Sequence, residues 1–91
     1  MLFYRSADLL ITGTHVVVLQ PVEARFHLEA IQAPYVLRHA RGVRFRAGHE
    51  IRASYEHADV RIYFTTDRAR FSAVRRALIR ALEQRAHPLP F

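Results

Sequence analysis

The fold is decided by residues 48–83, which read GHEIRASYEHADVRIYFTTDRARFSAVRRALIRALE. In the first half of this stretch apolar and polar residues alternate, and a period of two is typical of half-buried antiparallel strands. After Asp67 the apolar residues recur every three or four positions, which is the spacing of an amphipathic helix. The change of period predicts a strand hairpin that is followed directly by a helix.

The sequence also predicts a register for this hairpin. A tight turn at residues 57–58 brings apolar residues together on one face, because side chains alternate along a strand. His-Ala is a poor pair for a two-residue turn, so a slightly longer loop stays open as an alternative. The predicted pairs are Tyr55 with Val60, Ala53 with Ile62, and Ile51 with Phe64.

The helix is predicted over residues 67–86, with Thr66 or Asp67 as its cap and Pro88 as its stop. Its two faces differ in character, because the arginines Arg76 and Arg80 lie opposite an apolar stripe. We therefore expect the helix to pack on a sheet, rather than to act as a basic helix for nucleic acid or an anionic membrane. The stripe consists of Phe71, Val74, Leu78 and Leu82.

Further strands are expected over residues 2–6, 8–12, 14–20, 22–28 and 35–39, with Gly13 and Pro21 at turns. The chain then forms a single domain, 1–91, with about six to seven strands in residues 2–66, a helix in 67–86 and a short tail in 87–91. This is an α+β arrangement. A strongly bent antiparallel sheet or half-barrel plugged by the C-terminal helix is the economical solution, and it is the general plan of pleckstrin-homology-like domains.

Three segments carry a resemblance to known proteins: FYRSADLLIT at 3–12, RFHLEAI at 25–31 and YEHADVRIYFTTDRARFSAVRRALIRALE at 55–83. They resemble a family of small uncharacterised actinobacterial proteins with a strand-rich body, a Tyr-Arg-Ser start and a Thr-Asp-x-x-x-Phe entry to a basic helix. The resemblance is weak over residues 38–48. It implies a pleckstrin-homology-like plan and an actinobacterial host, and it transfers no catalytic or binding residue.

Composition excludes several classes of protein. Hydrophobic residues make up 51% and charged residues 24%, which is a globular balance. With no cysteine, the chain has no disulfide, no thiolate nucleophile and no Cys-ligated zinc. The N-terminus lacks the pattern of a signal peptide, and no apolar run is long enough to span a membrane. We expect a soluble cytoplasmic protein.

Motifs for catalysis or for a cofactor are not recognisable. The six histidines show no metal-ligand spacing, the serines lack a nucleophile elbow, and the three glycines do not form a phosphate loop. A surface metal site at His49 and His57, near Glu50, Glu56 and Asp59, is the alternative to solvated turn histidines. The sequence therefore predicts a non-enzymatic protein with no catalytic residue, cofactor or metal.

The net charge of +6 suggests an anionic partner, such as nucleic acid or lipid phosphate. Arginines concentrate in residues 37–52, LRHARGVRFRAGHEIR, and could hold phosphates through their guanidinium groups. All 14 Lys and Arg residues are arginine, however, and the codon bias of a GC-rich genome favours Arg over Lys without any functional pressure. Within residues 37–52, Phe45 is the one Phe, Tyr or Trp on which a nucleic-acid base could stack. The candidate anion-binding residues are Arg38, Arg41, Arg44, Arg46 and Arg52.

The first strands are apolar on both faces, whereas a one-layer sheet has one core face to offer. The surplus face is covered by the curl of the sheet, by the C-terminal tail or by another copy. We favour another copy, and predict a small non-enzymatic interaction or scaffold module that forms a homodimer and binds an unknown protein partner. The candidate self-association residues are Leu9, Ile11, Val17 and Leu19.

Overall fold

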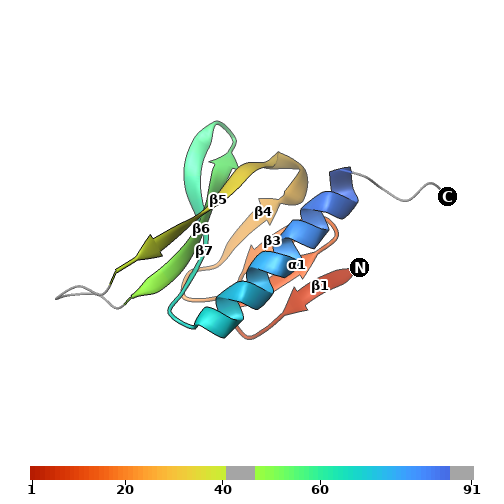
Figure 1. Cartoon of the computed structure of the whole chain (residues 1–91). Coiled ribbons are helices and arrows are strands. Elements are labelled where there is room, and N and C mark those ends of the chain that lie inside the picture. The colour runs from red at the N-terminus through yellow and green to blue at the C-terminus, as the bar shows by residue number, and fades with distance from the viewer. Residues whose placement is uncertain (41–46, 87–91) are drawn as a thin grey trace.

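The computed structural model describes residues 1–40 and 47–86 of the chain. These residues form seven antiparallel strands in two sheets, followed by one C-terminal α-helix (Figure 1). The predicted α+β class is therefore confirmed. Each strand pairs with its neighbour in the sequence within its sheet, so both sheets are simple meanders. The strands divide between two hydrogen-bonded sheets, whereas one strongly bent sheet or half-barrel is expected from the sequence.

The first sheet has the order β1-β2-β3-β4. Its strands are short, and its turns lie where Gly13 and Pro21 predict them. A single turn of 3₁₀ helix, η1 (Leu28–Ala30), then leads to the second sheet. The strands are β1 (Leu2–Arg5), β2 (Leu9–Thr12), β3 (His15–Val18) and β4 (Ala24–His27).

The second sheet has the order β5-β6-β7, and its strands are β5 (Ile31–His39), β6 (Gly48–Tyr55) and β7 (Ala58–Thr65). Strand β5 begins four residues earlier than predicted. An irregularity between Gln32 and Tyr35 leaves Ala33, with φ of 50°, and Pro34 outside the ladder. A proline is tolerated here because β5 lies at the edge of its sheet.

The predicted register of the β6–β7 hairpin is wrong. The turn residues are Glu56 and His57, with φ of 50° and 68°, and positive φ at both positions is the signature of a two-residue type I′ turn. A bulge further along β7 then shifts the ladder by one residue, so that Ile62 and Tyr63 are both buried. The observed pairs are Tyr55 with Ala58, Ala53 with Val60, and Ile51 with Tyr63.

The helix α1 (Arg68–Ala86) begins and packs as predicted. Asp67 caps it, since its Oδ1 accepts a hydrogen bond of 2.9 Å from the backbone N–H of Arg70. Figure 1 shows α1 lying across the first sheet, and it also contacts η1, β6 and β7. The predicted apolar stripe is confirmed: Phe71, Val74 and Leu78 are buried, and Leu82 is partly buried.

A polar network fastens both sheets to the helix. Asp8, in the turn after β1, accepts hydrogen bonds from the hydroxyls of Ser6 and Tyr63, the second at 3.0 Å. Arg70 of α1 pairs with the same carboxylate at 3.5 Å. Burial acts to raise the pKa of Asp8, but the two hydrogen bonds and the charge of Arg70 hold it below its usual range. Burial and the bond to Asp8 raise the pKa of Tyr63 to about 12.

Part of the predicted self-association surface is wrong, because two of its four residues lie in the core. Leu9 and Ile11 are 0% and 1% exposed, so they belong to the core and cannot form a surface patch. Val17 lies on the opposite face of β3 and is only half-buried, because successive side chains of a strand point to opposite faces. Leu19, beyond the end of β3, is 43% exposed. Only Val17 and Leu19 remain available to a partner.

Candidate interaction cleft between β5 and α1

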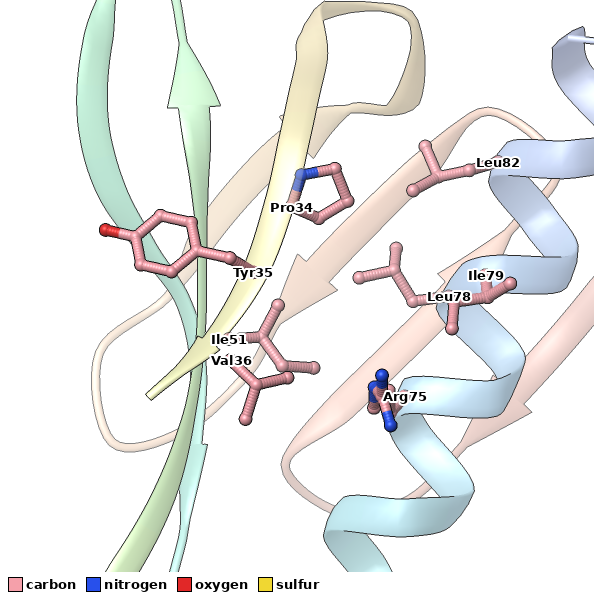
Figure 2. A pocket seen from close by; sticks show the side chains of 8 residues that line it. All are labelled: Pro34, Tyr35, Val36, Ile51, Arg75, Leu78, Ile79 and Leu82. Atoms are coloured by element: carbon pink, nitrogen blue, oxygen red, sulfur yellow. The ribbon is translucent and has the colours of Figure 1, made fainter. Parts of the chain in front are cut away.

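A cleft separates the edge strand β5 from the helix α1. Strand β5 pairs with β6 on one side, and no strand of the described residues pairs with its other edge. The cleft has a volume of about 160 Å³. Figure 2 shows helix side chains on one wall and the start of β5 on the other. The lining residues are Pro34, Tyr35 and Val36 of β5, Ile51 of β6, and Arg75, Leu78, Ile79 and Leu82 of α1.

The sequence builds the helical wall by spacing. Residues three, four and seven positions apart lie on one side of a helix, which brings Arg75, Leu78, Ile79 and Leu82 together. Leu78 is 3% exposed and belongs to the core as well, whereas Ile79 is 40% exposed. The stripe that holds the helix on the sheets thus continues into the open cleft.

The opposite wall is the irregular start of β5. Pro34 lies outside the ladder and faces the cleft, while the ring of Tyr35 points away from the helix in Figure 2. The Tyr35 hydroxyl donates a hydrogen bond of 2.9 Å to Asp59 on the outer face of the sheet. Tyr35 therefore lines the cleft near its backbone, and the wall is formed mainly by Pro34, Val36 and Ile51.

The cleft is small, and its lining is mostly apolar. Sites for cofactors and drug-sized molecules usually enclose about 300–1,000 Å³. The β5–α1 cleft is about half the lower limit, which suits a single side chain. Its lining contains one charged side chain, Arg75, and no carboxylate, histidine or hydroxyl nucleophile apart from the Tyr35 phenol that points away.

The predicted arginine cluster is divided by the fold. Arg38 pairs across the ladder with His49, and Tyr35 pairs with Arg52. Because Tyr35 and Arg38 are three residues apart in one strand, Arg38 and Arg52 lie on opposite faces of the sheet. Arg52 is engaged with carboxylates, at 2.9 Å from Asp59 and 3.3 Å from Glu50. Arg41, Arg44 and Arg46 lie outside the described residues.

A buried carboxylate, Glu50, was not expected from the sequence, which suggests only surface ion pairs. It is 1% exposed, and it contacts Arg61, Arg52 and, at 3.1 Å, the Nε2 of His39. Burial acts to raise the pKa of Glu50, but hydrogen bonds from Arg61 and His39 and the two arginine charges lower it. The available signal was the arrangement of Glu50 and Arg52 two residues apart, on the same face of β6. These groups form a structural ion network.

The metal site considered in the sequence analysis is not found in the part of the chain that the structure describes. There, no three His, Asp or Glu side chains are grouped so as to hold an ion. His49 and Glu50 are neighbours in β6 and so point to opposite faces of the sheet.

Within residues 1–40 and 47–86, no helix has both the length and the apolar character needed to cross a bilayer. Comparison of the chain with protein-family models, with curated proteins and with solved structures gives no match.

Proposed function

We propose that this protein is a non-enzymatic interaction module that binds an extended segment of a partner protein in the cleft between β5 and α1. The observation that carries the proposal is an apolar cleft beside a strand edge that no other described strand covers. Strand addition uses these two features together: main-chain hydrogen bonds provide affinity, and a neighbouring pocket selects a side chain.

The start of β5 limits where a partner segment can pair. Pro34 has no N–H to donate, and the irregularity between Gln32 and Tyr35 interrupts the strand. Regular pairing therefore begins at Tyr35 and runs toward His39, directly beside the cleft. Such interruptions also restrict uncontrolled pairing at a sheet edge, so they favour a defined partner over aggregation.

The chemistry of the partner segment follows from the lining. One apolar side chain fills the space between Val36, Leu78 and Ile79. Arg75 is exposed at the cleft and forms no ion pair with a carboxylate of the described residues, so an acidic residue beside the apolar one complements it. The segment is thus extended, with an apolar anchor next to Asp or Glu.

The arrangement of the strands supports a pleckstrin-homology-like plan. A four-stranded meander, a three-stranded meander and a C-terminal helix follow one another, as this plan requires. A second copy of the chain could also supply the extended segment. Such a dimer would use the cleft, and not the surface of the first sheet predicted from the sequence, of which Val17 and Leu19 lie outside the core. The alternative, an anion binder that uses the arginines of residues 38–52 as one cluster, loses support because Arg52 is paired with carboxylates and lies on the face of the sheet opposite Arg38.

The test begins with selection of nine-residue peptides from a random display library on the wild-type protein. Affinities of the selected peptides are then measured for Ile79→Glu and for a control, Val22→Glu. Both changes place a carboxylate on an exposed apolar residue, at 40% and 74% exposure. Val22 lies outside the cleft, in a second apolar hollow of about 330 Å³ beside β7.

We expect peptides with an apolar anchor and an adjacent acid, a loss of at least about tenfold for Ile79→Glu, and less than about twofold change for Val22→Glu. Circular dichroism checks that both variants fold. If Val22→Glu abolishes binding while Ile79→Glu does not, or if no peptide is enriched, the proposed site is wrong. If the free protein sediments as a dimer that Ile79→Glu dissociates, the occupant is a second copy.

A further inference from the structure

A basic pocket lies where α1 meets strands β5 and β6. It has a volume of about 210 Å³ and adjoins the cleft described above, with which it shares Arg75 and Ile79. Its lining is polar and positively charged rather than apolar. The lining residues are Arg38 of β5, His49 of β6, and Arg68, Phe71, Ser72, Arg75, Arg76 and Ile79 of α1.

Two rigid elements hold the charged groups. Arg38 and His49 are direct partners in the β5–β6 ladder. The ring of His49 stacks on Phe71 of the helix, with centroids 4.9 Å apart and planes 26° from parallel, which fixes the hairpin against α1. Arg68, Ser72 and Arg76 follow one another at intervals of four residues, so they line one side of the helix. The arginines therefore converge on the pocket from regular secondary structure.

The charge in this pocket has no counterpart in the described residues. Arg25, Arg52, Arg61, Arg70 and Arg85 each pair with a carboxylate. None of the four pocket arginines does so within residues 1–40 and 47–86, and the pocket lining contains no acid. Four unneutralised guanidinium groups around one hollow make a local field that attracts anions.

His49 adds an independent observation. Its Nδ1 is the one side-chain nitrogen or oxygen of the described residues that is buried without a hydrogen-bond partner. Buried polar atoms are nearly always hydrogen-bonded, and one explanation for an exception is a bound water or ion. The stacking on Phe71, rather than a hydrogen bond, keeps His49 at the wall of the pocket.

From these observations we infer that the pocket binds a phosphate monoester group or inorganic phosphate. Guanidinium groups present paired N–H donors that match phosphate oxygens bidentately, and the Ser72 hydroxyl provides a further donor. The volume is below that of typical sites for whole cofactors, so it suits a single phosphoryl group. This site does not depend on the proposed peptide cleft, because its distinguishing residues are Arg38, Arg68, Ser72 and Arg76.

The inference is tested by titrating the protein with inorganic phosphate at low salt and following backbone amides by NMR. The pocket variant is Arg38→Gln with Arg76→Gln. The control is Arg5→Gln with Arg80→Gln, which removes the same charge from exposed arginines outside the pocket that likewise have no ion pair in the described residues. Neither double variant changes a residue of the core, and the amide spectrum of each reports whether it is folded.

We expect saturable shifts at His49, Ser72 and Arg76, a loss of at least about tenfold in the pocket variant, and a change below about threefold in the control. Equal losses in both variants mean that only net charge attracts phosphate, and overturn the site. Shifts that do not saturate, or the absence of shifts at low salt, overturn it as well.

The source of the phosphate group is distinguished with glycerol phosphate and with vesicles of phosphatidylcholine containing phosphatidic acid. Both carry a phosphate monoester. If glycerol phosphate binds and the vesicles do not, the ligand is a soluble ester. If vesicles bind, lose binding in the pocket variant and are displaced by inorganic phosphate, the ligand is a lipid headgroup. Vesicle binding that the pocket variant retains, with no binding of either soluble ion, contradicts the inference.

Discussion

Replacing Leu78 by Ala tests the placement of α1, on which the walls of the cleft depend. Leu78 is 3% exposed and packs in the core formed by both sheets and the helix. The substitution removes three buried carbon atoms with their hydrogens, and burying each of them contributes about 0.8 kcal/mol. The lost burial alone therefore lowers the free energy of unfolding by about 2.4 kcal/mol. The void that remains adds to this loss, and Leu-to-Ala changes in cores cost about 2–5 kcal/mol altogether.

The open cleft beside Leu78 reduces the cost of the void. Water and neighbouring side chains can enter from the cleft, because Leu78 lines it as well as the core. We therefore expect the free energy of unfolding to fall by about 2–3.5 kcal/mol, the lower part of the range. Domains of this size are usually stable by about 5–15 kcal/mol, so the variant should fold and the loss should be measurable.

Urea denaturation followed by circular dichroism gives the free energy, with Ile79→Ala as the control. Ile79 is the next residue in the helix and is 40% exposed, so its truncation should cost less than about 1 kcal/mol. A loss below about 0.5 kcal/mol for Leu78→Ala, or a larger loss for Ile79→Ala than for Leu78→Ala, would show that the helix is rotated from the orientation described.

Three further predictions concern the second sheet and the helix cap. Glu50→Gln should lower the free energy of unfolding by about 1–3 kcal/mol at neutral pH, because a buried carboxylate loses its charge-assisted hydrogen bonds. The pKa of Glu50 is lowered from 4.5, so the stability that its charge contributes is present above about pH 4.5 and is lost as the pH falls through the folded pKa. The difference in unfolding free energy between wild type and variant, measured in urea melts, should therefore shrink in acid. Gly48→Ala should lower the free energy of unfolding by about 0.5–1.5 kcal/mol, because the added Cβ would lie 2.5 Å from the ring of Phe64. The loss should vanish when Phe64 is also changed to Ala, and an equal loss in both backgrounds would exclude this clash as the cause. Asp67→Ala should cost about 1 kcal/mol through loss of the helix cap, and no loss in a thermal melt would show that the cap is dispensable.

The features that the sequence predicted correctly are those set by local periodicity. The helix, its cap at Asp67 and the stripe from Phe71 to Leu82 follow from residues within a few turns of one another. The hairpin register was not predictable in the same way. Its turn at Glu56 and His57 adopts positive φ without glycine or asparagine, and the bulge in β7 shifts the pairing without a sequence signal.

The candidate sites depend on long-range packing, which local patterns do not encode. Neighbouring arginines in residues 37–52 suggested one cluster, yet Arg38 and Arg52 lie on opposite faces of the sheet. The partners that join Arg38 at the basic pocket, Arg68 and Arg76, come from a helix about thirty residues further along. Similarly, Leu9 and Ile11 look like surplus apolar surface until α1 covers their face of the sheet.

The central claim is that a partner segment joins the free edge of β5 beside α1. Amide hydrogen exchange with and without a selected peptide measures this directly, because strand addition gives hydrogen bonds to main-chain N–H groups that were open to water. The account predicts slower exchange at alternate amides between Tyr35 and His39, with little change in β7. Unchanged exchange in β5, or protection confined to β7 and the β3–β4 turn, would contradict it.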